Sequence, residues 1–232
     1  DMNVDKHVDP SINDMIRSLQ PRAVINNRGY DEGDFGTPER DYVAGIDEQR
    51  ELDRLTEACQ SVGVESWGYR LDEDYYTDRH LQRSISRYLA RDANYLLNVG
   101  PKPDGTIPEP SAGILNRIGK WYHAVKESFE GVTPASYLTR NKDVLLTRKE
   151  NTIYVHLVND PRTSGVKLDP IGTRPKSATL LNTGEAVDFT VDLVPTNHVE
   201  HIPYLRLRNL PANDLVNTVM VVRLEFDRAP DT

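Results

Sequence analysis

The stretch NYLLNVGPKPDGTI at residues 94–107 carries the clearest structural pattern in the chain. It opens with an apolar run, Tyr95-Leu96-Leu97, and then reaches Gly100-Pro101, which is typical of a fully buried strand that ends in a loop. A second proline and an Asp-Gly pair follow, and they restrict that loop to a defined shape. Because burying an unpaired amide is costly, we expect Asn98 either to brace neighbouring backbone or to face a ligand.

Helical and strand-like segments alternate on both sides of this strand through about residue 130. Apolar residues at helical spacing predict helices that Ser11 and Ser111 cap, and short apolar runs predict buried strands. The helices are expected at 9–19, at 79–90 and from 111 to 125 with Trp121 in the core, and the strands at 23–27 and 64–69. The glycine-rich segment 28–47 reads as a long functional or mobile loop. This alternation predicts a β/α architecture.

The pattern changes after Thr139, where short β-rich runs follow one another with no helical segment between them. Asn, Asp, Gly and Pro turns separate these runs, which occur at residues 144–147, 152–158, 177–181, 186–193, 204–210 and 219–226. Six short strands at regular spacing predict an antiparallel β-sandwich. We therefore divide the chain into a β/α part at 1–139 and an all-β part at 140–232.

Composition and charge exclude several classes of function. The 232 residues carry a formal net charge of -8, which argues against a nucleic-acid partner and for a neutral or small substrate. No apolar run approaches the roughly 20 residues of a membrane-spanning helix. Cys59 is the single cysteine, so no disulfide or thiolate cluster can form within the chain. The closely spaced His198 and His201 lie in a proline-flanked loop without a cysteine partner, and we predict no metal site and no cofactor.

Four stretches in order carry a resemblance to a known family. They read AVINNRGYDEGDFGTPE at 23–39, TEACQSVGVESWGY at 56–69, LQRSISRYLARDANYLLNVGPKPDGTI at 81–107 and LNRIGKWYHAVKESF at 115–129. Together they resemble the α-L-fucosidases of glycoside hydrolase family 29. The resemblance implies the second half of a (β/α)8-like barrel followed by an antiparallel β-sandwich. Thr56 departs from the pattern, because the family usually has a tryptophan before this glutamate.

The resemblance also implies a chemistry. Family members hydrolyse α-L-fucose from glycans with retention, which needs two carboxyl groups about 5 to 5.5 Å apart. By position, Asp1 matches the nucleophile, with Asp5 and Asp9 as alternatives. The acid/base is either Glu39 or Glu57, and the sequence leaves both open.

Three further residues are candidates for sugar binding: Arg28, which resembles the sugar-binding arginine of the family, Asn27 and Trp67. A planar guanidinium binds two sugar oxygens at once, and an indole ring stacks on the apolar face of a deoxy sugar. Two of these residues have a structural alternative. Arg28 could pair with Asp31 or Asp34, and Trp67 could belong to the core. Glu57 could equally lie on a solvated helix face.

Family members normally carry a first half of the barrel, with histidines that help to hold the sugar, and this half has no counterpart in the sequence. We expect the open sheet edges to need that half, a partner chain or self-association. A rival hypothesis follows, in which the chain is a non-catalytic fragment or carbohydrate-binding scaffold. The resemblance is compatible with a secreted, periplasmic or lysosomal location.

Overall fold

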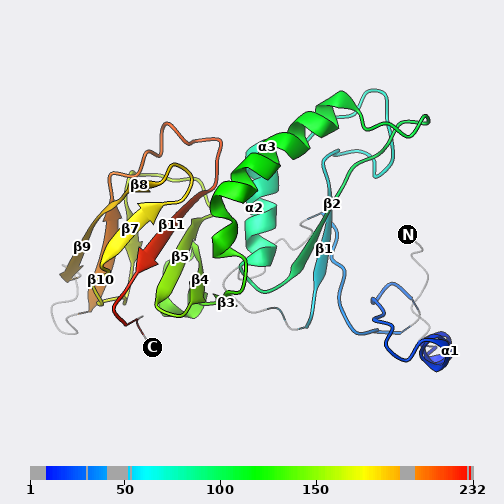
Figure 1. Cartoon of the computed structure of the whole chain (residues 1–232), viewed down its shortest axis with the longest axis horizontal. Helices are drawn as coiled ribbons and strands as arrows, with labels where there is room; N and C mark the ends of the chain where they lie inside the picture. Colours follow the sequence, from blue (N-terminus) through cyan, green and yellow to red (C-terminus); the bar gives the residue numbers. More distant parts are fainter. Residues whose placement is uncertain are drawn as a thin grey trace.

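The computed structural model describes residues 9–29, 31–40, 52, 54–193, 202–228 and 230. It has a helical part that contains a small parallel sheet and a part made of antiparallel sheets (Figure 1). Within the described residues, no helix combines the length and the apolar character that crossing a membrane requires.

Over its described residues, the first part contains three helices and two parallel strands. In chain order they are α1 (Ser11–Leu19), β1 (Glu57–Ser61), α2 (Asp78–Leu89), β2 (Asn94–Asn98) and α3 (Glu109–Val125), followed by the 3-10 turn η1 (Lys126–Ser128). The predicted helices at 9–19, 79–90 and 111–125 and the strand in the opening stretch are confirmed. Trp121 is 6% exposed, as its place in the helical stripe predicts.

Two strand predictions in this part are wrong. Residues 23–27 form no strand, and Val24 is 70% exposed. The backbone of Ile25 is instead held by Asp34, whose Oδ2 accepts from Ile25 N at 2.8 Å. Residues 64–69 are irregular, and the strand lies earlier, at Glu57–Ser61.

Both predicted serine caps are also wrong. Pro108 precedes α3, and Ser111 lies inside the helix at 2% exposure. Pro10 precedes α1, where the Asp9 carboxylate accepts a hydrogen bond from Ser11 N at 3.0 Å. By contrast, α2 has a side-chain cap, since the Thr77 hydroxyl accepts from His80 N.

In the second part, the residues that the structure describes form nine strands in two antiparallel sheets. The strands are β3 (Thr133–Pro134), β4 (Leu145–Lys149), β5 (Thr152–Leu157), β6 (Val166–Leu168), β7 (Ser177–Leu180), β8 (Glu185–Ala186), β9 (Asp188–Leu193), β10 (Pro203–Arg208) and β11 (Met220–Glu225), with the 3-10 turn η2 (Ser136–Leu138). One sheet has the order β3-β4-β5-β11-β7-β8 and the other β6-β10-β9. The six strands that the sequence predicts are all present.

Two apolar cores hold these layers together. Leu146, Val155 and Val222 of the six-stranded sheet share one buried cluster with Leu205 and Leu207 of the three-stranded sheet. A second cluster joins α2 and α3 to the opposite face of the six-stranded sheet, through the side chains of Leu81, Ile118, Trp121, Tyr154 and Val221. Helices α2 and α3 therefore lie between the antiparallel sheets and the β1–β2 pair (Figure 1).

Candidate functional site

The β1–β2 sheet has one covered and one open face. Ala58 packs on Tyr88 of α2, whereas its neighbour Cys59 lies on the opposite face because side chains alternate along a strand. Cys59 pairs in register with Leu96, whose 45% exposure shows that the described residues leave this second face uncovered. The prediction of a fully buried Tyr95-Leu96-Leu97 run is therefore wrong, since Leu96 is exposed and its two neighbours are only partly buried.

The open face continues into the segment that holds Glu39. Two isolated parallel bridges, Gly36 to Thr56 and Glu39 to Cys59, align residues 36–39 alongside β1. Main-chain hydrogen bonds fix this alignment, since Cys59 N donates to Pro38 O at 2.9 Å and Arg40 N to Cys59 O at 2.9 Å. Glu39 thus lies directly beside Cys59, on the segment that pairs with the edge of β1.

Arg28 and Glu39 form an ion pair, in which Arg28 Nη1 donates to Glu39 Oε1. Arg28 Nε also donates to Thr37 Oγ1 at 2.9 Å. The ionic partner that the structure gives Arg28 is thus the candidate acid/base. Asp34, one of its expected partners, pairs with Arg17 at 2.8 Å instead. The side chains of Arg28 and Glu39 remain 38% and 27% exposed, so both are accessible from solvent.

The thiol of Cys59 lies close enough to three charged side chains for them to influence its pKa. Burial raises the pKa of Cys59, the nearby Arg28 guanidinium lowers it, and the carboxylates of Glu57 and Glu39 raise it further. Glu57 precedes Cys59 by two residues in β1, so it lies on the same face of the strand as the thiol, close to which Arg28 and Glu39 also lie. The structure therefore brings together Arg28, Glu39 and Glu57, which are distant in the sequence.

Asn27 is connected to this cluster through Thr37. Its Oδ1 accepts from both Thr37 N at 3.1 Å and Thr37 Oγ1 at 2.8 Å. Thr37 in turn receives the Arg28 Nε hydrogen bond. Asn27 therefore orients Arg28 through Thr37 in this structure.

Trp67 is partly buried, and it contacts a residue that the sequence did not single out. The Arg40 guanidinium carbon lies 4.5 Å from the Trp67 ring centroid, which is a cation–π contact. Arg40 also donates to the carbonyl oxygens of Gly63 and Val64. Asn98 braces the same loop, because its Nδ2 donates to Trp67 O at 2.8 Å and to Ser61 Oγ at 3.2 Å. The expectation that Asn98 holds neighbouring backbone is confirmed.

Some of the remaining candidate residues lie outside the described part of the chain, and Glu57 lies inside it. Asp1 and its alternative Asp5 lie outside the described residues, as do His198 and His201. Glu57 is the first residue of β1, so it does not lie on a helix face. Among the residues that the structure describes, no group of three or more His, Cys, Asp or Glu side chains is arranged to hold a metal ion.

Sequence reasoning missed Thr37, Arg40 and Cys59. Thr37 and Arg40 flank the Pro-Glu pair at 38–39, and this proximity was the available signal. Cys59 follows Glu57 by two residues, which places both on one face once the segment is known to be a strand. Since the sequence did not identify that strand, this relation could not be deduced.

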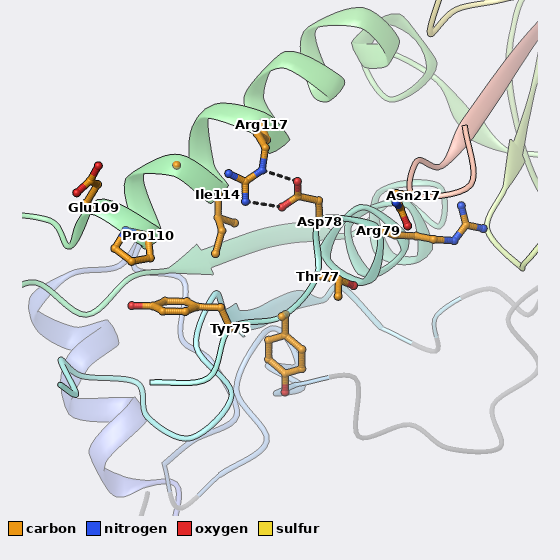
Figure 2. A pocket seen from close by; sticks show the side chains of 11 residues that line it. Tyr75, Thr77, Asp78, Arg79, Glu109, Pro110, Ile114, Arg117 and Asn217 are labelled. Atoms are coloured by element: carbon orange, nitrogen blue, oxygen red, sulfur yellow. Dashed lines mark hydrogen bonds and ion pairs between the residues drawn. The ribbon is translucent and has the colours of Figure 1, made fainter. Parts of the chain in front are cut away.

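A separate cavity of about 820 Å³ lies at the starts of α2 and α3 (Figure 2). Tyr75 and Glu109 line it, together with a two-pronged ion pair in which Arg117 Nε and Nη2 donate to the Asp78 carboxylate at 2.5 and 3.0 Å. None of the predicted site residues lines this cavity. The ion pair links the first turn of α2 to α3.

Comparisons with known sequences identify a relationship over the first part of the chain. A family model described as Alpha-L-fucosidase matches residues 1–127. Tissue alpha-L-fucosidase of Rattus norvegicus is 30% identical over 146 residues, which are 60% of this chain and 32% of that protein. Alpha-L-fucosidase of Dictyostelium discoideum is 28% identical over 165 residues, or 67% of this chain and 36% of that protein. The chain spans about a third of the length of these curated relatives.

Solved structures extend the similarity to nearly the whole chain. Alpha-L-fucosidase isoenzyme 1 from Paenibacillus thiaminolyticus is 27% identical with a TM-score of 0.72, over 98% of this chain and 56% of that one. An alpha-L-fucosidase from Vibrio sp. strain EJY3 has a TM-score of 0.74 over 94% of this chain and 38% of that one. At 20% sequence identity, this second likeness shows a shared fold alone.

Proposed function

The chain belongs to the α-L-fucosidase family, and from this premise we propose that it contributes to the hydrolysis of terminal α-L-fucose from glycans, with retention of configuration. One observation carries the proposal: two carboxylates and a guanidinium, drawn from separate segments, lie together on the open face of the β1–β2 sheet. A retaining glycosidase needs a carboxyl group that protonates the departing oxygen and then activates water. The cluster supplies two candidates for that group.

Glu39 is the better candidate for the acid/base. Catalytic side chains of β/α barrels gather at the carboxyl ends of the strands. Glu57 is the first residue of β1, whereas Glu39 pairs with Cys59 farther along it. The residue after Glu39, Arg40, reaches carbonyls of Gly63 and Val64, beyond the carboxyl end of β1. Position along the strand therefore favours Glu39.

The ion pair with Arg28 suggests how the sugar enters the site. A general acid must reach the departing oxygen, whereas the carboxyl group of Glu39 is bound by Arg28 in this structure. A bound fucose would offer hydroxyl oxygens to the Arg28 guanidinium and thereby release Glu39 for proton transfer. In this scheme Asn27 and Thr37 hold Arg28, Trp67 contributes an apolar surface, and Asp1 serves as the nucleophile.

The architecture of this proposal is half of a (β/α)8-like barrel at 1–139 followed by a β-sandwich at 140–232. The covered and open faces of the β1–β2 sheet support the first element, because a barrel strand faces helices on one side and the interior on the other. The core shared by the two antiparallel sheets supports the second element.

A second candidate function has its own supporting observation. Leu96 is 45% exposed on the open face, and the chain spans about a third of its curated relatives. Burying such a face requires further chain, either a first half of the barrel or a partner. In this alternative the chain is a non-catalytic scaffold until that half is supplied.

An aryl α-L-fucoside with a good leaving group tests the acid/base assignment. Glu39→Ala should leave the fucosylation step fast and slow the second step by about 10²- to 10⁴-fold, and added azide should restore turnover. Glu32→Ala, which removes an exposed carboxylate from the same loop, is the matched control and should behave as wild type. If Glu57→Ala alone shows azide rescue, Glu57 is the acid/base and the assignment of Glu39 is wrong.

A further inference from the structure

We propose that the outer face of the β6-β10-β9 sheet carries a binding groove for an anionic oligosaccharide, one that bears sulfate or carboxylate groups. The groove encloses about 480 Å³ and is lined by Lys167, Arg206, Arg208 and Tyr204, together with the turn at 163–165. It belongs to the antiparallel part of the chain and contains none of the residues assigned to fucose hydrolysis.

Strand register places the cations on one face. Leu205 and Leu207 are fully buried, so the alternating residues Arg206 and Arg208 of β10 point outward, and both are exposed. Lys167 of β6 pairs directly with Arg206. Like charges opposite each other on neighbouring strands destabilise a sheet unless something neutralises them.

These cations have little internal compensation. Arg206 and Arg208 make no ion pair with any residue that the structure describes, and Lys167 has only Asp169 at 3.9 Å. No carboxylate lines the groove. The chain as a whole is acidic, with a formal net charge of -8. The lining of this groove is basic by contrast, with three cations and no acid.

Besides Asp169, two acids lie on β9, across β10 from β6, and they share the outer face of the sheet with Arg208 and Tyr204. Asp188 and Asp192 of β9 pair in register with Arg208 and Tyr204. Asp188 accepts from Asn209 Nδ2 at 2.8 Å, and Asp192 accepts from Thr190 Oγ1 at 2.8 Å. Neither lines the groove, which opens toward β6. A ligand anion is therefore the charge partner that fits this side of the sheet.

The other lining groups favour a sugar as the carrier of the anion. Lys167 Nζ lies 4.9 Å from the Tyr204 ring centroid, so an aromatic surface and a cation occupy neighbouring positions. Sugar rings stack on aromatic side chains, while sulfate or carboxylate groups accept hydrogen bonds from guanidinium groups. Thr163, Ser164 and Asn209 add short polar side chains that suit hydroxyl groups.

Binding measurements with defined polymers test this inference without reference to activity. The probes are dextran sulfate, neutral dextran of equal chain length and a single-stranded oligonucleotide of matched charge, titrated by calorimetry. The variant Arg206→Gln with Arg208→Gln is compared with Lys120→Gln with Lys126→Gln, which removes the same charge from exposed positions in α3 and η1. Circular dichroism and thermal unfolding verify that both variants fold.

Dextran sulfate should bind and neutral dextran should not, and affinity should fall as salt screens the charges. The Arg206→Gln and Arg208→Gln variant should bind dextran sulfate about tenfold or more weakly, because two charge-assisted hydrogen bonds are lost. The control variant should retain wild-type affinity. Equal loss in both variants, no binding by wild type, or equally tight binding of the oligonucleotide would overturn the proposal. A catalytically inert chain that passes this test would leave the groove intact and refute only the proposed hydrolysis.

Discussion

His156 shows how burial of a single residue sets a pH limit on this fold. It is fully buried in β5, its Nε2 lies 3.0 Å from Thr147 Oγ1, and the Phe129 ring stacks on it at 4.9 Å between centroids. Burial lowers the pKa of His156 from 6.5 to about 3, because the charged ring would lose its hydration. The imidazole is therefore neutral in the folded protein under ordinary conditions.

This shift predicts a loss of stability in mild acid. The unfolded chain takes up a proton at His156 below pH 6.5, whereas the folded chain does so only near pH 3, so stability is full above 6.5 and falls as the pH drops toward 3. At about pH 5 the loss is about 2 kcal/mol in the free energy of unfolding. Urea denaturation of wild type and His156→Gln, above pH 6.5 and again at about pH 5, measures this loss of stability. An equal decline in the variant would contradict the assignment to His156.

At the scale of the elements, α3 contains a glycine whose cost can be measured. A Cβ at Gly119 would meet no atom within 4 Å, and the residue lies in the interior of the helix. Gly119→Ala should therefore raise the free energy of unfolding by up to about 1 kcal/mol, because alanine loses less backbone entropy in a helix. Thermal or urea unfolding tests this. Gly100→Ala is the contrasting variant.

Gly100 occupies a place where two loops meet. A Cβ there would clash with the main chain of Gly68 and Tyr69 in the loop after β1. Gly100→Ala should cost about 1–3 kcal/mol, since backbone rather than a flexible side chain must move. If both alanine variants changed stability in the same direction, this account of the two glycines would be wrong.

The elements also show what the sequence could and could not reveal. The stripes of α2 and α3 and the six β-rich runs were predictable, because each buries one face against a core and thus shows a regular period. Glu57–Ser61 was not, since EACQS has no apolar alternation and is held by pairing with β2. Residues 64–69 look strand-like, but side chains of Arg40 and Asn98 satisfy their carbonyls in place of a strand partner.

The same limit applies to the candidate site. Arg28 and Glu39 could be singled out from the motif NRGYDEGDFGTPE, since both residue types suit sugar chemistry. That they pair with each other depends on the parallel alignment of residues 36–39 with β1, which no local pattern specifies. Tertiary pairing, rather than local propensity, brings this site together.

At the scale of the whole molecule, the main chain of Val219 joins the helices to the six-stranded sheet. Val219 is fully buried, and its N–H donates to Gln82 Oε1 of α2 at 2.8 Å. Its carbonyl accepts from Trp121 Nε1 of α3 at 2.9 Å and from Asn182 Nδ2 at 3.0 Å. Arg79 of α2 adds a bond to the neighbouring carbonyl of Thr218. The two parts of the chain are therefore expected to unfold together.

Gln82→Met tests this coupling. It keeps the side-chain volume but leaves the buried Val219 N–H unpaired, which should cost about 1–3 kcal/mol. Far-ultraviolet circular dichroism follows the helices, and hydrogen exchange follows amides of β5 and β11. Both probes should shift by the same amount. A shift confined to the helical signal would show that the sheets unfold independently.

The most direct test of the central claim is proton NMR of the first product that the folded chain releases from an aryl α-L-fucoside. The account predicts that α-L-fucose appears first and that the β anomer forms later by mutarotation, since two displacements at the anomeric carbon retain its configuration. If β-L-fucose appears first, the mechanism is inverting and the roles assigned to the carboxylates are wrong. If a folded chain releases no fucose, the hydrolytic proposal for this chain is contradicted.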